Sequence, residues 1–172
     1  MLRWRGMWFK KEMVIFASLG ILLIAAGAAV SYLFLFRRPN PPLPANELKV
    51  GNTAFTVEIA STTIAQARGL SYRADLGENQ GMLFVFSRPA IQNFWMKDMN
   101  FPIDMIWIGA GAGGSGEQVL GFAQNAAPQP GVPLWSLTIY NSPDGTDKVL
   151  EVKAGTVAKD GIQIGDAVRL GS

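Results

Sequence analysis

Residues 93–105 read NFWMKDMNFPIDM, and the placement of this stretch decides how the chain around it folds. Apolar residues dominate it, yet it also carries Lys97, Asp98 and Asp104 close to Trp95. Charged side chains are rarely buried unless they are paired, so a strand buried on both faces would not need them. We therefore expect one apolar and one polar face, as in a β-hairpin.

A hairpin with arms at residues 93–97 and 102–107 would separate the two kinds of side chain. Lys97 and Asp104 then become diagonal neighbours, close enough for their charged ends to meet. The predicted core face holds Phe94, Met96, Ile103 and Met105, and the predicted polar face holds Asn93, Trp95, Lys97, Asp104 and Ile106.

The polar face has two interpretations, an ion pair that braces the sheet beside a packed Trp95, or a surface that binds a polar ligand such as a sugar or a peptide. Arg68, just before Gly69, could reach Asp104 or Glu151, either to neutralise a buried carboxylate or to bind a ligand. The candidate binding residues are Arg68, Asn93, Trp95, Lys97, Asp98, Asp104 and Glu151.

Short segments with turn signals between them surround this stretch. The pattern predicts a hairpin that turns at residues 51–52, a short helix at 61–68 and a single helical turn at 156–160. The glycine-rich residues 109–116 lack the Lys-Ser/Thr ending of a phosphate loop and are expected to be a hairpin loop. Further strands are predicted at residues 82–86, 119–123, 137–140, 149–153 and 167–170. We expect a mainly β domain, a compact sandwich or barrel with one or two short helices.

A single transmembrane helix is predicted at residues 13–36, which contain no charged residue. A helix of this length reaches roughly 36 Å, enough to cross a hydrocarbon core of about 30 Å. Four cations precede the segment and two follow it, which places the N-terminus in the cytoplasm and the rest outside the cell membrane. A cleavable signal peptide with a site near residues 26–28 is the alternative.

The remaining boundaries follow from composition. Residues 1–12 are a basic cytoplasmic segment, residues 37–47 a linker with four prolines, and residues 48–172 the extracytoplasmic β domain. Residues 1–47 contain six basic and two acidic residues, a net charge of +4. Residues 48–172 contain nine basic and eleven acidic residues, a net charge of −2. An acidic domain lacks the electrostatic footprint of nucleic-acid binding.

The chain contains no His and no Cys. This excludes Ser-His and Cys-His nucleophilic sites, thiol redox chemistry and the usual zinc sites. We expect no cofactor and a domain that is monomeric and folds without disulfides. Residues 46–172, expressed without the rest of the chain, are expected to fold alone.

Short motifs occur in a set order along residues 48–170. They are Arg68-Gly69-Leu70, Gly81-Met82-Leu83-Phe84, Phe94-Trp95-Met96-Lys97, Pro102-Ile103-Asp104, Ala127-Pro128, Leu150 to Gly155 and Gly165-Asp166. Together they resemble the domain of unknown function 192 (DUF192) family. The resemblance implies a compact, largely β domain of bacterial and archaeal proteins, often exported or membrane-anchored, and it implies no particular activity. Two residues depart from the family pattern. The family more often has an apolar residue at the position of Ser71 and Asn at the position of Asp98.

Two hypotheses about function remain at this point. In the first, the domain is a non-catalytic binding or accessory module of the cell envelope, with a polysaccharide, a peptide or a membrane protein as its partner. In the second, it is a hydrolase of an envelope polymer that uses two carboxylates among Asp98, Asp104 and Glu151, with Lys97 tuning their pKa. The second needs two acids that face one cleft.

Overall fold

The computed structural model describes residues 5–114 and 116–171, and the chain divides into two units at Arg38. The first unit contains helix α1 (Arg5–Phe36). Its segment Val14–Leu33 is long and apolar enough to cross a membrane, and a signal sequence near an N-terminus can meet the same criterion of length and composition.

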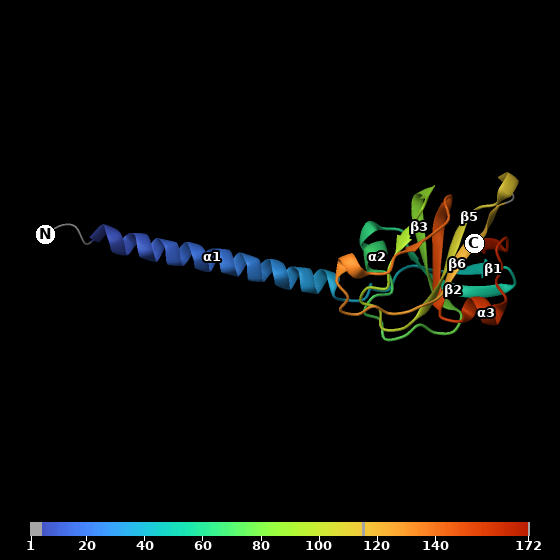
Figure 1. The fold of residues 1–172 in the computed structure, drawn as a ribbon, viewed down its shortest axis with the longest axis horizontal. Helices are drawn as coiled ribbons and strands as arrows, with labels where there is room; N and C mark the ends of the chain where they lie inside the picture. Colours follow the sequence, from blue (N-terminus) through green and yellow to red (C-terminus); the bar gives the residue numbers. More distant parts are fainter. Residues whose placement is uncertain (1–4, 115, 172) are drawn as a thin grey trace. The chain divides into compact units, whose positions relative to one another are not determined.

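The second unit is a closed seven-stranded barrel, as the mainly β prediction allowed, with strand order β1-β2-β3-β8-β5-β6-β9 (Figure 1). All neighbouring strands are antiparallel except β2 and β3. The barrel strands are β1 (Ala45–Val50), β2 (Thr53–Ala60), β3 (Gln80–Ala90), β5 (Ile103–Ala110), β6 (Glu117–Ala126), β8 (Thr146–Lys153) and β9 (Ala167–Leu170).

Shorter elements lie outside the barrel wall. The two-residue strands β4 (Asn93–Phe94) and β7 (Tyr140–Asn141) pair with each other. The remaining elements are the helices α2 (Thr63–Arg68) and α3 (Thr156–Asp160) and the 3-10 turns η1 (Ala112–Gly114) and η2 (Leu134–Ser136).

Helix α2 lies in the crossover between the parallel strands β2 and β3, and local sequence sets both of its ends. The Thr62 side chain accepts a hydrogen bond from the Ala65 amide at the start. Gly69 ends the helix with φ +50°, which favours glycine, and a Cβ there would approach the Phe84 ring to 3.2 Å. The short helix predicted at residues 61–68 is thus confirmed, with α2 beginning at Thr63.

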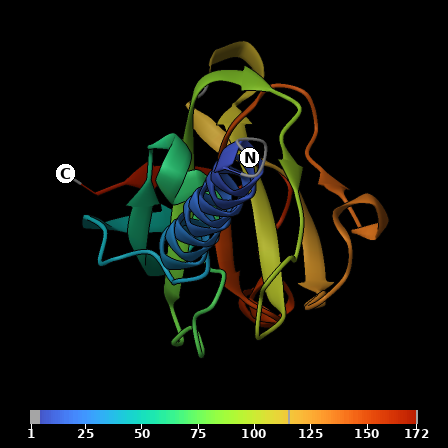
Figure 2. The same cartoon turned by 90° about the vertical axis from the view of Figure 1, so that its left-hand side faces the viewer.

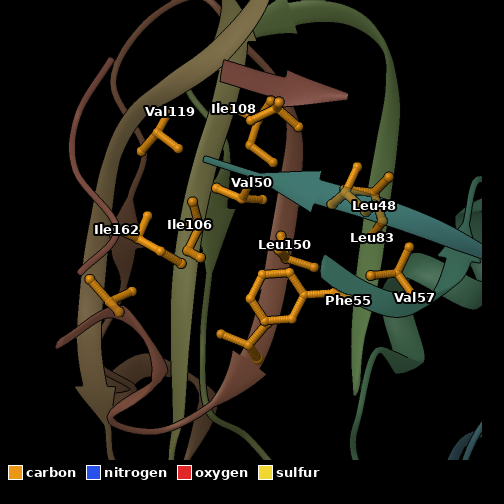
Figure 3. Close-up of a cluster of buried hydrophobic side chains, with 13 residues drawn as sticks. Leu48, Val50, Phe55, Val57, Leu83, Ile106, Ile108, Val119, Leu150 and Ile162 are labelled. Carbon is orange, nitrogen blue, oxygen red and sulfur yellow. The ribbon is translucent and has the colours of Figure 1, made fainter. Parts of the chain in front are cut away.

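One hydrophobic core fills the barrel interior (Figure 3). Alternate residues of each strand point into this core. Examples that are at most 1% exposed are Leu150 and Val152 of β8 and Ile106 and Ile108 of β5. Phe55 of β2 joins them from across the barrel.

A second core covers the outer face of the wall formed by β3, β8, β5 and β6. Met82, Met105 and Trp107 point outward from the strands and pack against Ala65 and Leu70 from the α2 segment. These strands are therefore buried on both faces, which explains why residues 82–86 are apolar without alternation.

The hairpin predicted for residues 93–107 is wrong. β4 pairs with β7, where Phe94 lies opposite Tyr140, and β5 lies between β6 and β8. Met96, Ile103 and Met105 are fully buried as predicted, but so is Ile106, which was placed on the polar face. The prediction assumed one solvent-exposed face, whereas β5 has a core on each side.

Two further boundaries differ from the predictions. Residues 137–139 do not form a strand, because the regular pairing begins only at Tyr140. The predicted linker ends at Glu47, whereas β1 begins at Ala45 and the linker residue Asn40 is already buried against the domain. The hairpin at residues 51–52, the helical turn at 156–160 and the hairpin loop after β5 are confirmed.

Candidate functional site

A pocket of about 190 Å³ opens between the C-terminal end of α2 and strand β4. The pocket extends to the outer face of the barrel wall, where Phe84 of β3 and Glu151 of β8 line it. The lining residues are Gln66 to Ser71, Phe84, Phe86, Gln92 to Trp95, Met99 and Glu151.

Four aromatic side chains, Phe84, Phe86, Phe94 and Trp95, line the pocket. Phe94 packs edge-to-face against Phe84 and Phe86, with ring centroids 5.0 and 6.3 Å apart. On its other side Phe94 meets Trp107 with centroids 5.7 Å apart, which ties the pocket to the outer core. Trp95 remains 47% exposed and provides an aromatic surface at the rim.

Glu151 is the acidic residue of the pocket. β-sheet register places it between Met82 of β3 and Met105 of β5, on the outer face of β8. It is 5% exposed, and among the described residues its Oε2 atom has no hydrogen-bond partner. Burial raises the pKa of its carboxyl to about 8, against a smaller opposite effect of the charge of Arg73. At neutral pH the group is therefore mostly a neutral carboxylic acid, which donates as well as accepts a hydrogen bond.

Two amide side chains that line the pocket are held by backbone carbonyl groups. Gln66 donates through Nε2 to the carbonyl oxygens of Ala60 and Val85, at 3.3 and 2.8 Å. Gln92 donates through Nε2 to the Thr146 carbonyl at 3.2 Å. These bonds fix the pocket walls to β2, β3 and β8.

The structure brings together four of the seven predicted site residues, Arg68, Asn93, Trp95 and Glu151, around this pocket. The predicted hairpin had placed Asn93 and Trp95 on one surface because alternate residues of a strand point to the same face. Their shared location comes from β4 crossing the outer face of the barrel beside the end of α2.

Asp104 is not part of the pocket, and the predicted Lys97–Asp104 pair does not form. Asp104 is fully buried, and its carboxylate accepts hydrogen bonds from the backbone amides of Asn125 at 2.8 Å and Val157 at 2.9 Å. It joins β5 to β6 and to the first turn of α3, so its role is structural.

Lys97 forms an ion pair with its neighbour Asp98, and neither residue lines the pocket. The Asp98 carboxylate also accepts a hydrogen bond from the Tyr72 hydroxyl at 2.6 Å, and the Tyr72 amide donates to the Asp98 carbonyl at 2.9 Å. The two bonds between Asp98 and Tyr72 thus fasten the loop after β4 to the chain after α2.

Sequence reasoning missed the amides Gln66 and Gln92, the phenylalanines of the wall and the ion pair between Arg73 and Glu58. Arg73 binds both Glu58 oxygens, at 2.5 and 2.7 Å, and this bond lowers the Glu58 pKa. The phenylalanines of the apolar run at residues 82–86 could have signalled an outer core, because both faces of that strand are apolar.

No group of three or more His, Cys, Asp or Glu side chains suited to a metal ion occurs in the part of the chain that the structure describes. Among the residues that line the pocket, Glu151 has a buried carboxyl oxygen without a hydrogen-bond partner in the described part of the chain.

Comparison with known proteins matches residues 46–170 to the DUF192 family model, described as "Uncharacterized ACR". A solved protein of unknown function from Novosphingobium aromaticivorans DSM 12444 is 31% identical, with a TM-score of 0.65 over 76% of this chain and 90% of that chain. A putative transcription regulator from Sinorhizobium meliloti 1021 is 26% identical, with a TM-score of 0.66 over 76% and 97% of the two chains. No curated protein matches the chain.

Proposed function

The chain belongs to the DUF192 family of uncharacterised proteins, and we propose that it is a membrane-anchored, non-catalytic binding protein that presents its barrel outside the cell membrane. The pocket at the end of α2 is the proposed binding site. Its ligand is a small amphipathic group, such as an apolar side chain of an envelope peptide, that also carries a hydrogen-bond acceptor.

The buried Glu151 carboxyl is the observation that supports this ligand class. A polar group buried without a partner costs free energy, about 1–3 kcal/mol, which a bound acceptor would recover. Four aromatic side chains line the pocket, so it offers contact area to an apolar group.

The paired-carboxylate hydrolase has less support. It needs two acids at one cleft, and of its three candidates only Glu151 lines the pocket. Asp104 is engaged by two backbone amides, and Asp98 by Lys97 and Tyr72.

Binding of N-acetylphenylalanine amide is expected to weaken about tenfold between pH 6 and pH 9. The Glu151 pKa is about 8, so at pH 9 only about a tenth of the carboxyl groups keep the donor proton. Chemical-shift titration of the full chain in phosphatidylcholine nanodiscs would measure the affinity. Glu151→Gln keeps an N–H donor and should remove the pH dependence.

Trp95→Ala should weaken the same binding, whereas Trp135→Ala, which removes an indole outside the pocket lining, should not. Spectra of each variant would show that the barrel remains folded. Equal affinity of the Trp95 variant and the wild type, together with no effect of pH, would rule out the pocket as the binding site.

The membrane anchor is proposed from the apolar segment Val14–Leu33 of α1 and from the cations on its N-terminal side. In spheroplasts, external protease should remove the barrel and leave a small membrane-bound fragment. A mature protein that begins near Ala29 would instead identify α1 as a cleaved signal sequence. Protection of the barrel from protease would contradict the proposed orientation.

Nucleic-acid binding is suggested for the Sinorhizobium protein by its description as a putative transcription regulator, and it has no comparable support in this chain. The net charge of residues 48–172 is −2, and phosphate recognition depends on clustered Lys and Arg.

A further inference from the structure

We propose that the end of the barrel formed by α2 and η2 rests on the bilayer, so that the ligand pocket opens at the level of the lipid headgroups. This inference depends on the proposed anchor and names a second partner of the barrel, the lipid surface itself. It follows from a short tether, an apolar surface and the charge of the segments that carry it.

The tether is short because the linker is fixed to the barrel almost at once. The Asn40 side chain is buried and donates through Nδ2 to the carbonyls of Ala65 and Gly69, at 3.0 Å each. Helix α1 ends at Phe36, so four residue steps separate it from this point. An extended chain of that length covers at most about 14 Å. Asn40, which is bonded to Ala65 in α2 and to Gly69 at its end, is therefore limited by chain length to about 14 Å from Phe36.

Large apolar side chains are exposed on this end. Trp135 is 87% exposed and Leu134 65% exposed in η2, and Ile64 is 61% exposed on α2. The α2 helix and the orange segment around η2 lie on the same side of the barrel, opposite the tip of the β5–β6 hairpin (Figure 1). Figure 2 shows them apart from each other, with the yellow-green chain that follows β3 between them. A flat surface could therefore meet both.

The charge of these segments suits an anionic bilayer. Residues 61–72, 86–95 and 127–141 contain no Asp or Glu, although residues 48–172 carry eleven acidic residues. Their charged residues are Arg68 and Arg88. Exposed Trp and aliphatic side chains together with cations are typical of surfaces that enter the headgroup region. Trp95, at the rim of the pocket, lies in the same segments.

Depth-dependent quenching would test this contact. The chain has no Cys, so single cysteines can carry a fluorescent probe in the full-length protein. Thr63→Cys and Ser136→Cys lie beside the apolar residues, and Ala110→Cys, exposed at the end of β5, serves as the control. The protein would be reconstituted in vesicles of phosphatidylcholine and phosphatidylglycerol with a spin label on the lipid.

Quenching at positions 63 and 136 is expected to be at least about twofold stronger than at position 110, because a docked surface enters the lipid by about 5–10 Å. Replacing Ile64, Leu134 and Trp135 with serine should reduce it to the level at position 110. Equal quenching at all three positions, or strong quenching that survives the three replacements, would overturn the proposal. Release of the chain by alkaline carbonate would instead show that the anchor itself is wrong.

Discussion

Replacing Glu151 with glutamine is expected to stabilise the barrel by roughly 3–5 kcal/mol at pH 9 and to change its stability little at pH 4.5. The folded protein holds the Glu151 proton up to a pKa of about 8, whereas the unfolded chain releases it near the ordinary value of 4.5. The folded state therefore binds more protons within this window, and the free energy of unfolding falls as the pH rises from about 4.5 to about 8. Glutamine, which has no proton to lose, removes this penalty.

Pulse proteolysis of the full chain in nanodiscs, at a series of pH values, would measure the free energy of unfolding. Glu58→Gln is the matched control, because its carboxyl is bound by Arg73 and its pKa is lowered. That substitution should destabilise the barrel at neutral pH, by no more than about 1 kcal/mol for a pair this exposed, and the loss should disappear as the pH falls. If Glu151→Gln changed the free energy of unfolding equally at pH 4.5 and pH 9, folding would not raise the pKa of the Glu151 carboxyl.

Replacing Asp104 with alanine is expected to destabilise the barrel by roughly 2–6 kcal/mol, because each of two amide donors to this buried carboxylate loses its acceptor at a cost of about 1–3 kcal/mol. The carboxylate is fully buried, and its loss would leave the amides of Asn125 and Val157 without their acceptor. Chemical denaturation of the full chain in detergent micelles, followed by tryptophan fluorescence, would measure this cost.

Lys97→Ala provides the comparison for Asp104. Its ion pair with Asp98 is partly exposed, with 32% and 22% of the two side chains accessible, so the cost should be about 1 kcal/mol or less. The effects of Asp104→Ala and Lys97→Ala should add in the double variant, because the two residues share no partner among the bonds described above. A strong coupling between them would favour the hairpin that the structure does not contain.

Local sequence signals predicted the elements whose cause is local. Thr62 and Gly69 mark the ends of α2, and alternation in residues 54–59 marks β2. The single helical turn at residues 156–160 also depends on nearby residues. The family resemblance and these elements together led to a mainly β domain.

The candidate site was predicted only in part. Arg68, Asn93, Trp95 and Glu151 are residue types suited to binding, and the structure places all four at one pocket. Gln66 and Gln92 gave no signal, because an amide bonded to distant backbone carbonyls looks like any surface amide in the sequence.

What the sequence by itself determined was the set of short strands and helices, the apolar segment before them, and a domain without His or Cys. Only the tertiary structure decided the partners of residues 93–107, because β4 pairs with β7 from almost fifty residues away and β5 joins a closed barrel. The surroundings of Asp104 and Glu151 were decided in the same way. Both are buried, but two backbone amides donate to Asp104, whereas Glu151 has no such donors to its Oε2 atom among the described residues and keeps its proton up to a pKa of about 8. A pKa depends on what surrounds the group in space, and those neighbours come from distant parts of the chain.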